Sequence, residues 1–428
     1  MRVKVAYGRE GLWIDLPAEN LTVVEPRYLP GLPDEQRSLR EALCHPLGAP
    51  PLAELVSPRD TVAIVFSDLT RPQPRRRMLP MLLDEIAAVP PEQVVLINAL
   101  ASHRPNTDDE MVGMLGREII DKVRVVQHNA FDREGNEYLG RTIAGHDMWI
   151  NAAYNRADVK ILTGFIEPHL FAGFSGGPKA VLPGIASQAS ILANHSAGMI
   201  GHPRATWGVT EGNPIWEEMR EVALRTWPTF LYNVTLNRDK QITGVFAGEL
   251  ERAHRAGTDF VAKTAMVPVE ELFDIVITSN SGYPLDLNLY QAVKGLSAAA
   301  QVVKPGGAIV IAAECWSGVA DHDEYSQLLQ SAPTPQALLE QIHASPEVLQ
   351  DQWQVQIQAQ VQARAEVYVK SSLSPADVEG AMLRVCDSIE DTVAQLLERY
   401  GPGASICVLP EGPMTIPYLL PPGRSKPG

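Results

Sequence analysis

The sequence predicts an α/β protein of two domains, each built on a mostly parallel sheet, with a functional site in the cleft between them. Residues 61–66 and 94–97 are apolar without alternation, as is typical of parallel strands buried on both faces. Segments with helical spacing follow such runs, and this alternation of strand and helix is typical of a doubly wound sheet. A chain of 428 residues is long enough for two such cores.

The elements of the first domain follow from local patterns. Val3, Val5 and Tyr7 alternate with polar residues before a glycine-bounded turn, which predicts a hairpin. Thr107 and Glu110 form the T-x-x-E pattern that begins a helix. The expected order is a hairpin at 3–14, a helical patch at 34–43 within a connecting arm, strand 61–66, helix 78–88, strand 94–97, helix 107–120, strands 123–126 and 159–162, a helix from 187, a hairpin at 231–247 and a helix at 249–261.

The second domain is expected after residues 262–270, where the pattern relaxes. Its expected order is strand 274–277, loop 279–286, helix 288–303, strand 308–312, a long polar helix at 346–366, a helix at 375–388 and strand 404–409. We therefore expect an N-terminal domain at 1–265, a C-terminal α/β domain at 266–420 and a flexible tail at 421–428.

The chain is acidic, with a formal net charge of −15 and a pI near 5.2. This charge argues against nucleic acid or an anionic membrane surface as a partner, although local cations can still hold an anionic ligand. The four cysteines are scattered without a CxxC pair, which fits a reducing compartment. Neither a signal peptide nor a run of roughly 20 apolar residues is visible, so we expect a cytoplasmic protein.

Three loops that follow predicted strands carry unusual polar side chains. The pairs are Asp68 with Arg71, His103 with Arg104, and Glu167 with His169. In doubly wound sheets, ligands bind outside the carboxyl ends of the strands. The sequence therefore predicts one site built from three loops.

The third of these loops leads into a glycine-rich stretch with a single lysine, Lys179. A solvated lysine in a turn, a grip for phosphate and a covalent amine nucleophile all fit this pattern. The Walker A spacing is absent. His195, on a predicted helix, is either a packed core histidine or a metal ligand, and no H-E-x-x-H or paired-cysteine pattern accompanies it.

The other candidates are acid/base and anion-binding groups. His103 and His169 at one sheet edge suggest two general acid/bases that work on two faces of a substrate. The guanidinium of Arg71 suits a carboxylate or a phosphate. Tyr290 and Lys294, at i and i+4 of a predicted helix, are either surface residues or a cationic clamp.

Six segments together resemble the nickel-pincer lactate racemase family. They are S-D-L-T-R-P at 67–72, A-S-H-R-P at 101–105, E-P-H-L-F-A-G-F-S-G-G-P-K at 167–179, N-H-S-A-G at 194–198, Y-Q-A-V-K-G at 290–295 and D-Q-W at 351–353. The segments come in the family's order and spacing, and they cover both predicted domains.

The resemblance implies a cofactor and a role for each motif residue. The family's cofactor is nickel pyridinium-3,5-bisthiocarboxylic acid mononucleotide, which would be attached covalently to Lys179, with His195 as the nickel ligand. His103 and His169 would be the acid/bases. The cofactor-binding residues would be Asp68, Leu69, Thr70, Arg71, Lys179 and His195. The substrate-binding residues would be Arg71, Tyr290, Gln291, Lys294 and Trp353.

Such an enzyme would racemise a small 2-hydroxy acid by reversible hydride transfer from C2, with a histidine taking the hydroxyl proton. Lactate is the default substrate; malate, an aromatic or longer aliphatic 2-hydroxy acid and an aldonic acid stay open. Proteins of cofactor biosynthesis are candidate partners. Two other classes also stay open: a non-catalytic carrier of the cofactor, and a zinc hydrolase that uses Glu167, His169 and His195.

Overall fold

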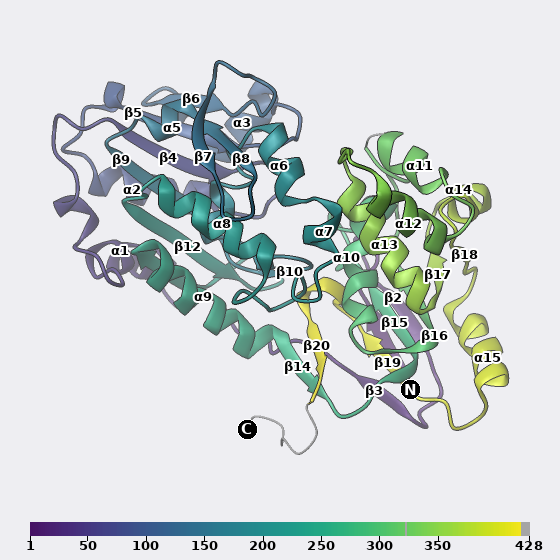
Figure 1. The fold of residues 1–428 in the computed structure, drawn as a ribbon. Helices are drawn as coiled ribbons and strands as arrows, with labels where there is room; N and C mark the ends of the chain where they lie inside the picture. The colour runs from purple at the N-terminus through teal and green to yellow at the C-terminus, as the bar shows by residue number, and fades with distance from the viewer. Residues whose placement is uncertain (322, 421–428) are drawn as a thin grey trace.

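Two six-stranded sheets form the centre of the protein, which the computed structural model describes over residues 1–321 and 323–420 (Figure 1). The strand order is β13-β12-β9-β4-β5-β6 in the first sheet and β18-β17-β16-β15-β19-β3 in the second. Every neighbouring pair in these sheets is parallel except β12 with β13. The predicted α/β class with two mainly parallel sheets is therefore confirmed.

The first sheet is covered by helices on both faces. Its strands are β4 (Val62–Ser67), β5 (Val94–Ala99), β6 (Arg124–Gln127), β9 (Val159–Phe165), β12 (Phe230–Leu236) and β13 (Ile242–Gly248). Ile64 and Phe66 of β4 face one core and Ala63 and Val65 face the other, because successive side chains of a strand alternate between its faces. The first core also receives side chains of α1 (Glu35–Cys44), α2 (Arg75–Glu85) and α3 (Asp108–Leu115). The second receives those of α5 (Ala152–Asn155), α6 (Gln188–Asn194), α8 (Pro214–Arg225) and α9 (Leu250–Ala265).

Some elements of this half differ from the expected order. The predicted helix 107–120 is divided into α3 and α4 (Arg117–Ile120) at Gly116. An antiparallel hairpin of β7 (Asn136–Arg141) and β8 (Asp147–Asn151) was not predicted, and neither was α8. The predicted hairpin at 231–247 is confirmed as β12 and β13, whose first strand also pairs in parallel with β9.

The second sheet consists of β15 (Phe273–Ser279), β16 (Val303–Ala312), β17 (Glu366–Lys370), β18 (Arg384–Val385), β19 (Ile406–Leu409) and β3 (Leu21–Val23). Its helices are α10 (Leu289–Ala300), α11 (Asp323–Leu329), α12 (Pro335–Ala344), α13 (Gln352–Arg364), α14 (Pro375–Gly380) and α15 (Ile389–Tyr400). The predicted helix 375–388 is wrong beyond Gly380, since β18 follows it and α15 is a separate helix.

The predicted polar helix at 346–366 is shorter and is buried. It begins at Gln352 and ends at Arg364. Four of its glutamines are buried, and backbone carbonyls accept the amide N–H groups of three of these: Gln354, Gln356 and Gln358. Gln354 donates to Tyr290 O at 2.7 Å, and Gln356 donates to Ala197 O of α7 (Ala197–Ile200) at 2.9 Å. These bonds join α13 to both halves of the molecule.

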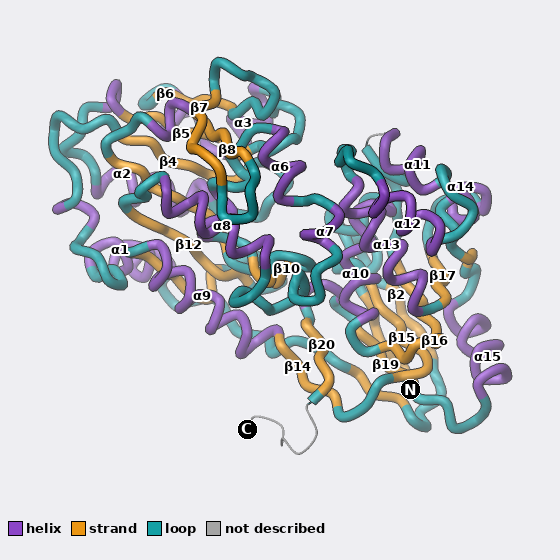
Figure 2. Tube along the Cα trace, viewed as in Figure 1, coloured by secondary structure: helices purple, strands orange, loops and turns teal. Residues whose placement is uncertain are grey.

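The strands before residue 24 lie with the second sheet. β3 pairs with β19, and the hairpin of β1 (Arg2–Val5) and β2 (Leu12–Asp15) packs in the same core as β15 and β16, so the N-terminal limit of the first domain stays a prediction. The limit near residue 265 stays a prediction. There α9 leads into β14 (Met266–Val269), which pairs with β20 (Ile416–Leu419), and Figure 2 shows this pair between the two large sheets. The predicted tail at 421–428 lies outside the described residues.

None of the helices in the described part of the chain combines the length and the apolar character that a membrane crossing requires.

Candidate active site

A cavity of about 220 Å³ is lined by the loops that follow the strands of the first sheet and by α10 and α13 of the second. The predicted site residues on its wall are Asp68, Arg71, His103, His169, Lys179, His195, Tyr290, Gln291, Lys294 and Trp353. Two predicted residues are not part of the wall. Leu69 is 43% exposed, and the hydroxyl of Thr70 donates to the carboxylate of Asp68 at 2.8 Å. The three loops expected to converge are therefore together.

Asp68 and His103 form a hydrogen-bonded pair at the ends of β4 and β5. Nδ1 of His103 lies 2.8 Å from Oδ2 of Asp68, which is 3% exposed, whereas His103 reaches solvent. Burial alone would raise the pKa of Asp68, but the hydrogen bond and the charge of His103, with Arg71 nearby, lower it. An ionised Asp68 holds the Nδ1–H tautomer of neutral His103, so Nε2 of that ring is free to accept a proton.

The loop that carries Asp68 and Arg71 is held by a buried arginine that the sequence did not single out. Arg75 donates from Nε to Ser67 O at 2.7 Å and from Nη2 to Arg71 O at 2.9 Å and to Asp68 O. Burial lowers the pKa of Arg75 to about 10, so it stays charged at neutral pH. Gln73 adds a bond to the other side of the loop, since its Oε1 accepts from Ser67 N at 2.7 Å.

Lys179 lies in a short 3₁₀ turn, Gly177–Ala180, behind two glycines. Gly176 and Gly177 have φ values of +76° and +51°, which favour glycine, and Gly177 N donates to Oδ1 of Asn233 at 2.8 Å. Burial lowers the pKa of Lys179 to about 7, and the positive charges of Arg71 and Lys294 act in the same direction. Roughly half of this amine is therefore neutral at pH 7 and able to act as a nucleophile.

Positive charge accumulates at this cavity although the chain as a whole is acidic. Burial lowers the pKa of Lys294 to about 8, and Arg71 lowers it further by repulsion. Two carboxylates line the same wall: Asp68, which pairs with His103, and Glu167, whose pKa burial raises against the effect of Lys294 and Arg71. Three cations facing one another are stabilised by an anionic ligand, such as a carboxylate or a phosphate.

His195, at the end of α6, is arranged as a metal ligand would be. Its Nδ1 donates to Ile191 O at 3.0 Å, and burial followed by the charge of Lys179 lowers its pKa to about 3. The ring is therefore neutral with a free lone pair on Nε2. Edge-to-face contacts with Phe171 and Trp353 restrict the plane of the His195 ring, whose centroid lies 5.0 Å from that of Phe171 and 5.1 Å from that of Trp353.

A zinc site of Glu167, His169 and His195 has no support in the structure. The described residues contain no group of three or more His, Cys, Asp or Glu side chains that could hold a metal ion.

His169, on the short strand β10 (Pro168–His169), carries its ring proton on the opposite nitrogen from His103, a difference called opposite polarity below. Its Nδ1 accepts from Ala172 N at 3.2 Å, so the neutral ring carries its proton on Nε2. Burial lowers its pKa well below the usual value, and the charges of Lys179 and Lys294 add to this effect. In this state, His169 presents a hydrogen-bond donor to the cavity and His103 presents an acceptor.

Asn233 is a site-supporting residue that the sequence did not reveal. It is a buried amide in the mostly apolar strand β12, and this amide among apolar neighbours was the available signal. Glu218, on α8, is a second buried polar residue near the site, and no motif marks it.

Comparisons with known proteins agree with this geometry. A family model described as lactate racemase N-terminal domain matches residues 7–208, and one described as lactate racemase C-terminal domain matches residues 269–416. The chain is 36% identical over 382 residues to a lactate racemase of Lactiplantibacillus plantarum, covering 88% of this chain and 90% of that protein. It is 37% identical over 405 residues to a lactate racemase of Thermoanaerobacterium thermosaccharolyticum, covering 90% of this chain and 94% of that protein.

Solved structures show the same likeness. The lactate racemase apoprotein from Thermoanaerobacterium thermosaccharolyticum superposes with a TM-score of 0.93 at 34% identity, covering 97% of this chain and 100% of that one. A protein from Thermotoga maritima, at 18% identity and a TM-score of 0.68 over 92% of this chain and all of that one, shares the fold.

Proposed function

Because the chain belongs to the lactate racemase family, we propose that it interconverts the two enantiomers of a small 2-hydroxy acid, with lactate as the expected substrate. The protein is a lactate racemase-like isomerase. One observation carries the assignment of the site: a single cavity combines three cations with two histidines of opposite polarity. The carboxylate of a 2-hydroxy acid would bind the three cations, and its hydroxyl would contact the two histidines.

The residues of the cavity fit the nickel-pincer nucleotide of the family. Lys179 would hold it covalently, since part of its amine is neutral at pH 7. His195 would bind nickel through Nε2, and Arg71 would pair with the phosphate or with the substrate. When bound, the cofactor would supply a reversible hydride acceptor for the C2 hydrogen of the substrate.

The protein's own groups then position the substrate and move its hydroxyl proton. Lys294 and Arg71 would hold the carboxylate so that C2 can be approached while the rest of the substrate stays fixed. Gln291 and Tyr290 lie on the same helix and line the same cavity. His103 would take the hydroxyl proton at Nε2, with Asp68 stabilising the imidazolium that results.

His169 would serve the other enantiomer after its environment changes. Attachment of Lys179 removes one positive charge, and bound anions neutralise those of Arg71 and Lys294. Burial is the main cause that lowers the pKa of His169, and these charges lower it further, so removing them would act to raise it. To exchange a proton at Nε2, the ring must give up its Nδ1 contact with Ala172 N and place a proton on Nδ1.

A carrier of the cofactor is the second candidate. It would need Lys179 and His195 but not the pair of Asp68 and His103, whose arrangement favours catalysis. The test is to supply the purified protein with mature cofactor, to verify added mass on Lys179 and bound nickel, and to follow both enantiomers of lactate, malate, aromatic and aldonic 2-hydroxy acids by chiral chromatography. Interconversion of at least one acid supports a racemase. A fully loaded protein that converts none of them is a carrier.

A further inference from the structure

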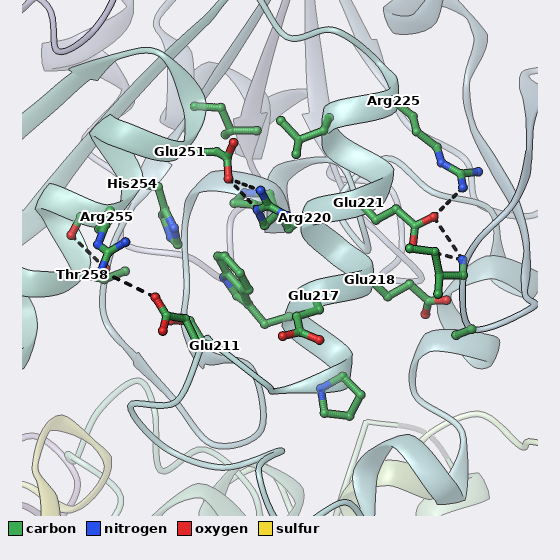
Figure 3. A pocket seen from close by; sticks show the side chains of 18 of the residues that line it. Glu211, Glu217, Glu218, Arg220, Glu221, Arg225, Glu251, His254, Arg255 and Thr258 are labelled. Atoms are coloured by element: carbon green, nitrogen blue, oxygen red, sulfur yellow. Dashed lines mark hydrogen bonds and ion pairs between the residues drawn. The ribbon is translucent and has the colours of Figure 1, made fainter.

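A buried carboxylate behind His195 has no part in the reaction described above. Glu218 of α8 is 3% exposed and lies beside Glu217 and Glu221 of the same helix in Figure 3. Its Oε1 accepts from Thr142 Oγ1 at 2.6 Å and pairs with His146 Nδ1 at 2.9 Å. Its Oε2 accepts from Asn194 Nδ2 at 2.8 Å. Desolvation of a carboxylate is unfavourable unless such bonds offset it, so the three donors hold the Glu218 carboxylate in one place.

The bond to Asn194 ties the end of one helix to the middle of another. Asn194 is the last residue of α6 and has no exposed surface. Its Nδ2 donates to Glu218 and also, at 3.3 Å, to Ile215 O of α8. A helix of seven residues is marginal by itself, so its last turn depends on such tertiary bonds.

The next residue after Asn194 is His195, and its ring is oriented by that same last turn. Both the backbone N–H and Nδ1 of His195 donate to Ile191 O, at 3.0 Å in each case. Movement of the end of α6 would therefore move the imidazole and its free Nε2. The aromatic contacts of His195 restrict the plane of the ring but supply no hydrogen bond.

We propose that Glu218 is a positioning residue for His195: through Asn194 it fixes the last turn of α6, and this keeps the imidazole in the orientation that binds nickel. The inference rests on the proposed function. Groups that support a metal ligand commonly change metal affinity 10- to 100-fold when they are replaced.

Three variants test the proposal in the cofactor-loaded full chain. Glu218→Gln keeps the volume but replaces one carboxylate oxygen by an N–H donor, so either Asn194, or Thr142 and His146 together, lose their acceptor. Asn194→Ala removes the link to α6 itself. Thr142→Val is the matched control, because it removes a bond to the same carboxylate on the side away from α6.

The readouts are the rate of nickel release to a chelator and the melting temperature. We expect release on the order of 10-fold faster or more in Glu218→Gln and Asn194→Ala, and a rate within about twofold of wild type in Thr142→Val. A merely structural role would give all three variants similar losses of melting temperature and similar release rates, which overturns the proposal. Wild-type release in a folded Asn194→Ala overturns it as well, even if Glu218→Gln does not fold.

A readout in the apoprotein separates this inference from the proposed function. In ¹⁵N-labelled apoprotein, the imidazole shifts should report a single Nδ1–H tautomer for His195 in the wild type and in Thr142→Val, and a mixture of tautomers in Asn194→Ala. Identical shifts in all proteins would contradict the positioning role. Absence of nickel and of added mass on Lys179 in the matured wild type would instead contradict the proposed function.

Discussion

Lys179 of the apoprotein should titrate more than three pH units below an ordinary lysine. Its pKa is lowered to about 7 from 10.5, first by burial and then by Arg71 and Lys294. At pH 7 roughly half of its amine is neutral, against about 0.03% for an exposed lysine, an advantage on the order of 1,000-fold in the reactive form. Replacing Lys294 by glutamine removes one repelling charge and should move the titration of Lys179 to higher pH.

The assay is competitive acetylation of the apoprotein with limiting acetic anhydride between pH 5 and 10, read by mass spectrometry of peptides. Lys122 is exposed and serves as the internal reference. Reactivity of Lys179 should rise through pH 7 and level off, whereas that of Lys122 should still be rising at pH 9. A Lys179 profile that superposes on that of Lys122, in both the wild type and Lys294→Gln, would refute the electrostatic argument for the cavity.

Three further substitutions test separate parts of the site. Lys294→Gln in the loaded enzyme should raise KM for the 2-hydroxy acid on the order of 10- to 100-fold, because a charge-assisted hydrogen bond of about 1.5–3 kcal/mol is lost; an unchanged KM would remove Lys294 from the carboxylate site. Asp68→Asn should lower kcat by roughly 10²–10⁴-fold, since His103 loses the partner that fixes its tautomer, and chiral chromatography of initial rates would show it. Gly177→Ala should destabilise the protein by about 1–3 kcal/mol in denaturant unfolding, because φ is +51° there and the added Cβ would lie 2.5 Å from the ring of His254. A wild-type kcat in Asp68→Asn would show that the bond from Asp68 to His103 does not support catalysis. Wild-type stability in Gly177→Ala would show that the backbone at this position tolerates a side chain.

The residues at the centre of the site could be predicted from local sequence, because buried parallel strands form continuous apolar runs. The apolar runs of β4, β5 and β9 end at Ser67, Ala99 and Phe165, and the polar residues that follow were expected to meet at the carboxyl edge of one sheet. They do line one cavity. Two pieces of information were enough to predict this: the positions of the apolar runs, and the rule that ligands bind outside the carboxyl ends of parallel strands.

Other features depend on partners that are distant in the chain. β3 was not predicted, because its partner is β19, and the paired residues Leu21 and Ile406 are nearly 400 residues apart in the chain. The burial of the glutamines of α13 was not predicted, because nothing local in the sequence indicates that carbonyls such as Tyr290 O and Ala197 O accept from their amide N–H groups. The burial of Glu218 could not be predicted for the same reason, since its three hydrogen-bond donors come from other segments of the chain.

In the reaction we propose, the C2 hydrogen leaves as hydride and returns to the opposite face without exchanging with solvent protons. The most direct measurement supplies the loaded enzyme with L-lactate deuterated at C2 in ordinary water and follows the isotope in the D-lactate formed, by mass spectrometry. We predict that the deuterium is retained at C2, because the histidines exchange only the hydroxyl proton. D-lactate with hydrogen from solvent at C2 would show that a histidine removes a proton from carbon, and would contradict it.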